Sequence, residues 1–385
     1  MVSPVIVLAP DKFKGSLSAP EVCAAMATGL RRVWPDADIR LRPMADGGDG
    51  TLDAILAGGG ERGTRCVSAA DGVARPAPYG VLRQAGERVA VLEIASLVGI
   101  TDSHATAVPV LERTTQGIGE LMLTLLDDGI RRFVIGLGGS STNDAGAGLL
   151  CALGARMSDA SGALFHARAQ RLADIAVTDL SALDPRLQQC EITVLSDVDN
   201  PLTGERGATA VFGPQKGVTP DVIRGVDQAI GHFADVIEPA AGRRVREVAG
   251  AGAAGGLGFA FLILGARIER GAEVVADLIA LDAALSNADW LITGEGRTDE
   301  QTLAGKAPWV AAHRARSVGV PATLIAGAVD AGSLEALSQV FDGCFALPDA
   351  PMNVEACIER AQPLLADRAQ QVARLWQAAR ARHRA

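Results

Sequence analysis

Residues 133–150 read FVIGLGGSSTNDAGAGLL and indicate the fold class. The apolar run at 133–137 is short and continuous, as buried parallel strands are. A loop of Gly, Ser and Asn residues follows it, and a helix is predicted from about residue 145 to 154. A strand that passes through a Gly/Ser loop into a helix is the unit from which α/β proteins are built.

The same alternation continues on both sides of this stretch. Further strands are predicted at 5–9, 39–44, 192–195, 290–293 and 322–326. Helices are predicted at 19–33, 51–57, 116–128, 220–237, 304–317 and 353–380. Because buried strands and helices alternate, the sequence predicts an α/β protein.

The chain of 385 residues is longer than one hydrophobic core usually grows, so two domains are expected. Residues 64–100 hold short strand candidates separated by turns, which indicates antiparallel pairing. Parallel alternation returns near residue 288. We predict a discontinuous parallel-sheet domain of the Rossmann or flavodoxin-like kind, an inserted mixed α+β domain, and an active site in the cleft between them. The predicted ranges are 1–64 with 286–385 for the first domain and 65–285 for the second.

Composition excludes several classes of partner. The 36 Lys and Arg against 45 Asp and Glu give a net charge of -9, and only 4% of residues are aromatic, so nucleic acid binding is not expected. The six cysteines form no CxxC pair and indicate reduced thiols of a cytoplasmic protein. The apolar runs are too short for a membrane span, and the N-terminus lacks a basic signal region. The sequence leaves a homodimer open.

Polar clusters follow the first two predicted strands. Lys12 and Lys14, beside Asp11, can neutralise a phosphate or a carboxylate, although an exposed turn with solvated lysines would look the same. In the DGGDGT segment at 46–51, Asp46 and Asp49 can act as a general base or bind Mg²⁺. Asp49 can instead cap the next helix.

The loop after the strand at 133–137 suits an anion, because helix N-terminal amides and hydroxyls favour negative charge. It is not a Walker A loop, since no Lys follows its glycines, and Ser141 breaks the GxGxxG spacing. The alternative is a tight turn capped by Asn143 or Asp144.

Three more loops complete the set. Asp197, at a strand end, can take a proton or a metal, or form an ordinary turn before Pro201. GAGAAGGLG at 250–258 matches GxGxxG but follows a poor strand, and Gly255 onward is predicted in a helix. GEGRTDEQTLAGK at 294–306 offers acids and a lysine for Mg²⁺ and phosphate, with a solvated loop as the alternative.

Six motifs in order carry a resemblance to a family. They are DKFKGSLSA at 11–19, PMADGGDGT at 43–51, GLGGSSTNDAGAG at 136–148, SDVDNPL at 196–202, GAGAAGGLG at 250–258 and ITGEGRTDEQTLAGK at 292–306. Together they resemble the bacterial glycerate kinases of the first class, those related to glycerate 2-kinase. The resemblance implies ATP- and Mg²⁺-dependent phosphorylation of D-glycerate, most often to 2-phospho-D-glycerate, on a two-domain α/β framework. One departure is Arg297-Thr298, where a small or apolar pair is expected.

The hypothesis is that the lysines and the Gly138–Ser141 loop engage anionic groups, while a carboxylate accepts the hydroxyl proton. The predicted catalytic residues are Lys12, Lys14, Asp46 and Asp197. The predicted substrate-binding residues are Asp49, Ser140, Ser141, Asn143, Asp144, Asn200, Gly255 and Gly256. The predicted ATP-binding residues are Gly138, Gly139, Gly294, Gly296 and Lys306, and the predicted Mg²⁺ ligands are Glu295 and Asp299.

Three alternatives stay open. GLGGSS also resembles the phosphate loop of homoserine and mevalonate type (GHMP) kinases, so another small hydroxy-acid or GHMP-like metabolite kinase fits. A non-catalytic hydroxy-acid or nucleotide sensor would bind without turnover. A dehydrogenase that uses NAD would rest only on the glycines at 250–255.

Overall fold

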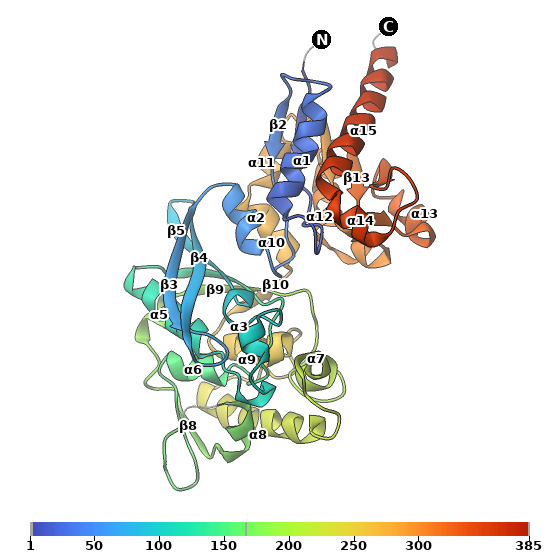
Figure 1. The fold of residues 1–385 in the computed structure, drawn as a ribbon. Coiled ribbons are helices and arrows are strands. Elements are labelled where there is room, and N and C mark those ends of the chain that lie inside the picture. The colour runs from blue at the N-terminus through green and yellow to red at the C-terminus, as the bar shows by residue number, and fades with distance from the viewer. Residues whose placement is uncertain (1–2, 166–167, 384–385) are drawn as a thin grey trace. The chain divides into compact units, whose positions relative to one another are not determined.

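The computed structural model describes residues 3–165 and 168–383, and the chain divides into two compact units (Figure 1). Unit 1 comprises Met1–Asp46, Asp53–Gly59 and Ala272–Ala385. Unit 2 comprises Gly47–Leu52 and Gly60–Gly271. Each unit has its own main sheet and its own hydrophobic core.

The main sheet of unit 1 has five parallel strands in the order β15-β13-β11-β1-β2. They are β1 (Val5–Leu8), β2 (Asp38–Leu41), β11 (Trp290–Thr293), β13 (Ala322–Ala326) and β15 (Gly343–Ala346). Counted along the chain, this is the flavodoxin-like order 2-1-3-4-5, and it confirms the predicted parallel α/β fold. The strand order reverses between β1 and β11. In such sheets, ligands bind outside the carboxyl ends of the strands at this switch point.

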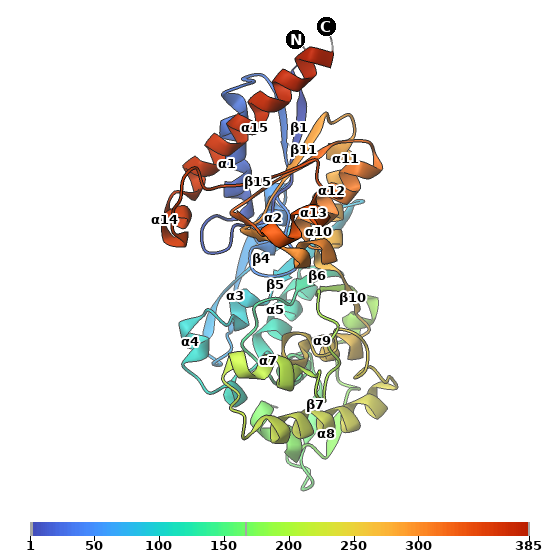
Figure 2. The same cartoon turned by 90° about the vertical axis from the view of Figure 1, so that its right-hand side faces the viewer.

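Helices flank this sheet. They are α1 (Ala19–Arg31), α10 (Gly271–Leu278), α11 (Leu281–Leu285), α12 (Ala307–Ser317), α13 (Leu334–Leu337), α14 (Val354–Glu359) and α15 (Ala361–His383). Figures 1 and 2 show α1 and α15 side by side. A side chain at Gly29 would collide with the carbonyl oxygen of Ala366, so glycine permits this close approach. Trp376 of α15 stacks on Trp290 of β11 with ring centroids 5.2 Å apart, which joins the last helix to the core.

The main sheet of unit 2 has six strands in the order β10-β9-β6-β5-β4-β3. They are β3 (Glu61–Ser68), β4 (Ala74–Gln84), β5 (Glu87–Glu93), β6 (Arg132–Gly136), β9 (Glu191–Leu195) and β10 (Arg267–Glu269). Strands β3, β4 and β5 pair antiparallel, as predicted for residues 64–100, and β5, β6, β9 and β10 pair parallel. Two small sheets pair β7 (Arg156–Ser158) with β8 (Val177–Asp179) in unit 2 and β12 (Arg297–Thr298) with β14 (Ala328–Val329) in unit 1.

Unit 2 contains the remaining helices, with α2 continuing from unit 2 into unit 1. They are α2 (Thr51–Ala57), α3 (Ala95–Val98), α4 (Ser103–Thr106), α5 (Gln116–Asp127), α6 (Ala147–Ala152), α7 (Ala208–Lys216), α8 (Ile223–Ala241) and α9 (Ala253–Ile263). The sequence patterns did not predict α7, because its apolar face is weak and Pro214 lies inside it. Helix α6 begins at Ala147 and not near 145, because Ala145 and Gly146 are in the left-handed region.

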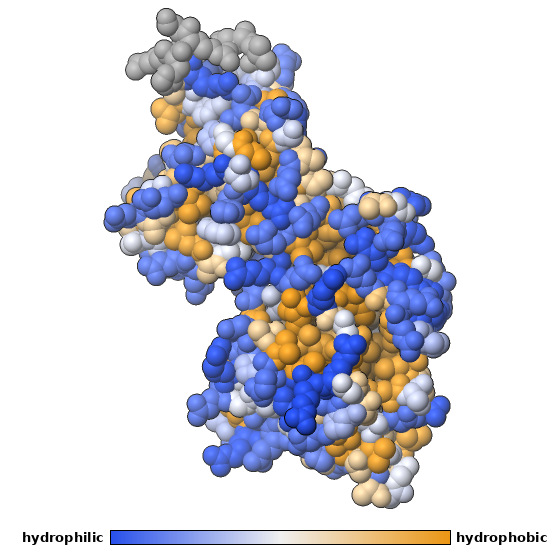
Figure 3. Space-filling model, turned by 180° about the vertical axis from the view of Figure 1, so that it is seen from behind, coloured by the Kyte–Doolittle hydropathy of each residue, from blue (hydrophilic) through white to orange (hydrophobic). Residues whose placement is uncertain are grey.

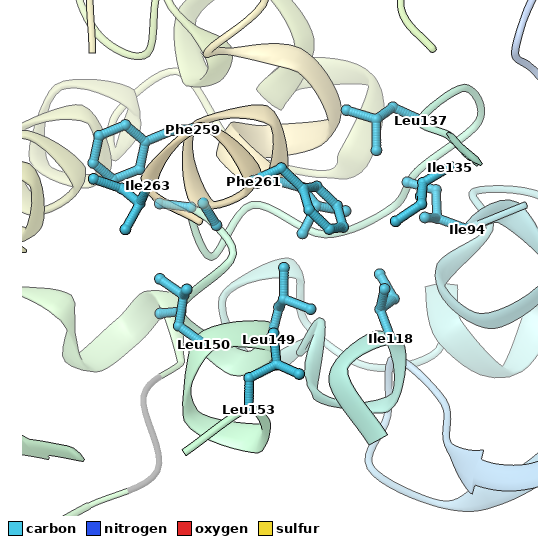
Figure 4. Packing of buried hydrophobic residues seen from close by; sticks show 14 of the residues in the cluster. Ile94, Ile118, Ile135, Leu137, Leu149, Leu150, Leu153, Phe259, Phe261 and Ile263 are labelled. Atoms are coloured by element: carbon cyan, nitrogen blue, oxygen red, sulfur yellow. The ribbon is translucent and has the colours of Figure 1, made fainter. Parts of the chain in front are cut away.

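Helices α6 and α9 pack on each other in the core of unit 2, beneath the loop that follows β6. In Figure 4 the side chains of the two helices face one another. Among the labelled residues are Phe259, Phe261 and Ile263 from α9, Leu149 and Leu150 from α6, and Leu153 directly after α6. Leu137 lies in the same cluster, so the loop begins from a fixed point.

Helix α9 is apolar on every side and is almost wholly buried. Within the described part of the chain, no helix combines the length and the apolar character that crossing a bilayer requires. The face in Figure 3 nevertheless shows hydrophobic side chains over a broad area of unit 2, with hydrophilic side chains around and across it.

Candidate active site

The loops after β1 and β11 meet at the switch point of unit 1. The amide of Asp11 donates to the carbonyl of Gly294 at 2.8 Å. The hydroxyl of Thr293 donates to the carbonyl of Ala9 at 2.7 Å. These bonds fix two of the predicted site segments side by side, at the sheet edge where α/β folds bind ligands.

Asp11 has a strongly perturbed carboxylate, although it was not among the predicted site residues. Burial raises the pKa of Asp11 to about 8, and the negative charges of Asp46 and Glu295 add to the rise. The amide of Lys12 donates to its carboxylate at 2.7 Å and opposes the shift. Three carboxylates that repel one another here favour a cation or an incoming proton. Asp11 follows the first strand closely in the sequence, and this position is the signal that could have identified it.

Glu295 is buried, and two threonine hydroxyls hold its carboxylate. Thr302 donates to Oε1 at 2.6 Å and Thr298 donates to the same atom at 3.1 Å. Burial raises the pKa of Glu295, while these bonds and the charge of Lys306 oppose the rise. Thr298 is one of the two unexpected residues in the motif, and the structure gives it the task of orienting Glu295.

The other predicted residues of this region have visible structural tasks. The carboxylate of Asp299 accepts from the amide of Gln301 at 3.0 Å and caps the 3₁₀ helix Glu300–Ala304. A side chain at Gly294 would collide with the carbonyl of Ile325, and one at Gly296 would crowd the backbone of Phe13 and Lys14. Lys14 itself is exposed, whereas Lys12 and Lys306 are half-buried.

The donor set of unit 1 suits a hard cation. Mg²⁺ usually keeps several waters and takes one or two protein carboxylates together with phosphate oxygens. Asp11, Asp46 and Glu295 supply carboxylates of this kind within one electrostatic cluster. Across residues 3–165 and 168–383, no three or more His, Cys, Asp or Glu side chains are grouped so that they could hold a metal ion by themselves. The cluster therefore fits a metal that is shared with a phosphate better than one held by protein alone.

In unit 2, the first half of the DGGDGT segment lies against the ends of β6 and β9. The amide of Gly138 donates to the carbonyl of Gly47 at 3.2 Å. Side chains at Gly136 or Gly138 would collide with the backbone of Gly47 and Gly48. Gly47 also has φ +93°, which disfavours any other residue. Close approach of two backbone segments thus explains these glycines.

Glu93, at the end of β5, was not among the predicted residues. Its carboxylate accepts from the amides of Gly50 and Leu52, both at 3.1 Å. The first turn of α2 is therefore capped from a neighbouring strand, which supports the macrodipole of that helix. Asp49, the candidate for this cap, is exposed.

Asp144 is fully buried and anchors the loop after β6. Its carboxylate accepts from the amide and the hydroxyl of Thr115, each at 2.9 Å. It also accepts from the amides of Gly146 at 3.1 Å and Gly148 at 3.3 Å. Burial raises the pKa of Asp144, and these bonds oppose the rise. Four donors saturate the carboxylate, so its visible task is to hold the loop.

The adjoining residues, Ser140 to Asn143, are buried and polar. The hydroxyls of Ser141 and Thr142 and the amide oxygen of Asn143 have no hydrogen-bond partner among the described residues. The side-chain amide of Asn143 donates to Thr209 at 3.0 Å. Lys216, also buried, donates to the Ser140 hydroxyl at 2.9 Å and to the Thr142 carbonyl at 2.8 Å. Lys216 was not among the predicted site residues.

The remaining predicted residues of unit 2 make hydrogen bonds or close backbone contacts within that unit. Asp197 accepts from the amide of Gly271 at 3.1 Å, and Asn200 donates to the carbonyl of Arg206 at 2.7 Å. Gly255 and Gly256 have φ of +70° and +88°, so they form a left-handed turn within α9, and the predicted helix is regular only after Gly256. Their backbone lies against the loop after β6, with the Ala145 amide donating to the Gly255 carbonyl at 3.0 Å.

Comparisons with known proteins agree along nearly the whole chain. A family model described as the glycerate kinase family matches residues 6–377. The glycerate kinase of Bacillus subtilis (strain 168) is 41% identical over 375 residues, which are 96% of each chain. The glycerate 2-kinase of Escherichia coli (strain K12) is 41% identical over 327 residues, which are 84% of this chain and 85% of the relative.

A solved structure is similar as well. It is described as "putative glycerate kinase 2" from Salmonella typhimurium LT2, with a TM-score of 0.86 and 40% sequence identity. The match covers 98% of this chain and 99% of that one.

Proposed function

Because this chain belongs to the glycerate kinase family, it is a phosphotransferase with an alcohol group as acceptor, and we propose that it transfers a phosphoryl group from ATP to D-glycerate. The observation that carries the proposal is the match of the family model along residues 6–377. The carboxylate cluster at the switch point of unit 1 supports it, because that is where this fold type binds ligands.

The proposed product is 2-phospho-D-glycerate. The relative from Escherichia coli, named glycerate 2-kinase, supports this choice. Transfer to the other hydroxyl would give the 3-phosphate. Enolase distinguishes the two products, because it consumes only the 2-phosphate.

Phosphoryl transfer needs in-line positioning and neutralisation of charge more than it needs covalent chemistry. We assign acceptance of the hydroxyl proton to Asp46, with Asp197 as the alternative. Asp46 belongs to the electrostatic cluster that also contains Asp11 and Glu295, where a proton or a cation is favoured. Lys12 and Lys306 carry positive charges that act on this cluster, as phosphate oxygens require, and Lys14 belongs to the same loop as Lys12.

Mg²⁺, when bound, supplies charge neutralisation on the phosphate oxygens. Glu295 would hold it in preference to Asp299, since the carboxylate of Asp299 caps a 3₁₀ helix. In unit 2, Gly138, Gly139 and the polar side chains of Ser140 to Asn143 would bind an anionic part of one substrate.

The test is a turnover assay with purified protein, ATP, Mg²⁺ and D-glycerate that follows ADP release. Enolase is added to one sample alone and to a second together with phosphoglycerate mutase. Direct coupling to enolase is expected and identifies the 2-phosphate. Coupling that requires the mutase would reverse the position of transfer. Absence of ADP release on addition of D-glycerate would exclude this acceptor and leave other small hydroxy acids to be assayed.

A further inference from the structure

Lysine is rare in this chain, and its four positions are therefore informative. Of 36 basic residues, only Lys12, Lys14, Lys216 and Lys306 are lysines, and the rest are arginines. Three of the four lie in loops predicted to bind phosphate or substrate. Lys216 is the fourth, at the end of α7 in unit 2, with 4% of its surface exposed. Lysine offers a compact ammonium where arginine would offer a planar fork, so the two are not interchangeable at a buried site.

Two buried cations hold consecutive carbonyls of the loop after β6. Arg113 donates to the carbonyl of Ser141 at 2.9 Å, and Lys216 donates to the carbonyl of Thr142 at 2.8 Å. Arg113 also donates to the carbonyl of Lys216 at 3.1 Å, so the two cations support each other's position. With its carbonyls bound to the interior, this loop has one strongly preferred conformation.

The same loop contains polar atoms that lack a partner. The Ser141 hydroxyl, the Thr142 hydroxyl and the Asn143 amide oxygen are buried without a hydrogen bond to any residue in 3–165 or 168–383. A buried polar atom without a partner loses its hydrogen bonds to water and gains none, so native proteins rarely leave one unpaired. The loop carbonyls of Ser141 and Thr142 are hydrogen-bonded, but the three side-chain oxygens are not. This contrast indicates that a bound polar molecule supplies the missing hydrogen bonds.

The direction of one hydrogen bond identifies the kind of group that is recognised. Because the ammonium of Lys216 donates to the Ser140 oxygen, the hydroxyl proton of Ser140 is left to donate elsewhere. We propose that Lys216 is a positioning residue that fixes the Ser140–Asn143 loop and directs the Ser140 hydroxyl toward an anionic oxygen of a substrate. This rests on the proposed function, in which both the carboxylate of glycerate and the phosphates of ATP present such an oxygen.

Protonation of Lys216 gives the inference a second readout. The charged groups that face the ammonium are Arg113 and Asp144. Burial lowers the pKa of Lys216 to about 7; the charge of Asp144 opposes this shift, and that of Arg113 adds to it. A neutral amine can accept the Ser140 proton, which reverses that hydrogen bond and withdraws the donor. Affinity for the anion should therefore fall as pH rises through about 7.

The experiment measures KM for D-glycerate, KM for ATP and kcat in the wild type, K216M and S140A. We expect one of the two KM values to rise about 10- to 100-fold, the range for a hydrogen bond that involves a charged group. A rise for D-glycerate identifies its carboxylate, and a rise for ATP identifies a phosphate. S140A keeps the lysine and should fold, so unchanged KM values in S140A would overturn the inference even if K216M fails to fold.

The control removes a buried charge elsewhere in unit 2. Glu238 is buried and accepts from Arg246 at 2.9 Å, outside the loop after β6. E238Q should lower the melting temperature and leave both KM values unchanged. If K216M behaves like E238Q, the role of Lys216 is only structural and the proposal is wrong.

Calorimetric binding of D-glycerate and of ATP separates this inference from the reaction, because it requires no turnover. Weaker binding of one compound to S140A than to the wild type, with the difference vanishing above pH 8, supports the proposal. Equal binding at pH 6 would overturn it, whether or not D-glycerate is phosphorylated.

Discussion

Aspartates of the glycine-containing motifs have opposite surroundings in the two units. Asp11 and Asp46, in unit 1, lie in a group of carboxylates that repel one another, and the pKa of Asp11 is raised to about 8. Asp144, in unit 2, accepts four hydrogen bonds and fixes the conformation of its loop. Carboxylates that repel one another favour a bound cation or proton, whereas a carboxylate surrounded by hydrogen-bond donors holds the framework.

The largest effect is expected from D46N. Removing the proposed proton acceptor should lower kcat about 10²- to 10⁴-fold, the usual contribution of general base catalysis. Because the substitution also removes a charge that repels Asp11, the melting temperature should not fall. Steady-state kinetics and thermal melting measure both quantities.

Two further variants control this result. D36N changes an exposed carboxylate of the same unit and should leave kcat as it is. D197N tests the alternative acceptor in unit 2. The assignment to Asp46 is wrong if D46N keeps its activity and kcat of D197N falls about 10²- to 10⁴-fold instead.

For D144A, we expect loss of stability ahead of any specific loss of catalysis. The substitution leaves the amides of Thr115, Gly146 and Gly148 without their buried acceptor. The free energy of unfolding of unit 2 should fall by about 3 kcal/mol or more, since each orphaned donor costs about 1–3 kcal/mol. Urea unfolding followed by circular dichroism measures this change. A variant of wild-type stability with weakened substrate binding would instead make Asp144 a binding residue.

The stability of unit 2 should also depend on pH through Lys216. Burial lowers its pKa from 10.5 to about 7, so between these values the unfolded chain binds more protons than the folded one. Stability therefore rises with pH across this window, by up to about 1.4 kcal/mol per pH unit, and the gain is lost as pH falls through 7. Unfolding of K216M should lack this slope. Parallel slopes in the two proteins from pH 7 to 9 would contradict the expectation.

Residues whose signal is local were accessible from the sequence. The parallel strands appear as short apolar runs, and the rule that ligands gather at strand ends led to Lys12, Asp46 and Glu295, which belong to one region of unit 1. Lys216 gives no such signal, because its partner Ser140 lies 76 residues away and α7 has no motif of its own. Glu93 was missed for the same reason, since a cap supplied by another strand is a tertiary contact.

The sequence also leaves the role of several glycines undetermined. Gly138 and Gly294 were predicted to bind ATP because each lies in a glycine-rich loop. In the structure, each also lies against a second backbone segment that leaves no room for a side chain. A pattern of glycines cannot distinguish close packing from phosphate binding, because both require the absence of a side chain.

The smallest predicted effect concerns Thr298, at the position where the motif departs from expectation. Its hydroxyl donates to Glu295 at 3.1 Å, and Thr302 donates to the same oxygen at 2.6 Å. T298A should leave Glu295 in place with one bond fewer, which is worth about 1 kcal/mol. The Mg²⁺ concentration for half-maximal rate should rise about fivefold, with kcat at saturating Mg²⁺ unchanged. T302A removes the shorter bond and should have the larger effect. If neither variant changes the Mg²⁺ requirement, Glu295 belongs with Asp144 as framework and not with the ligand-binding carboxylates of unit 1.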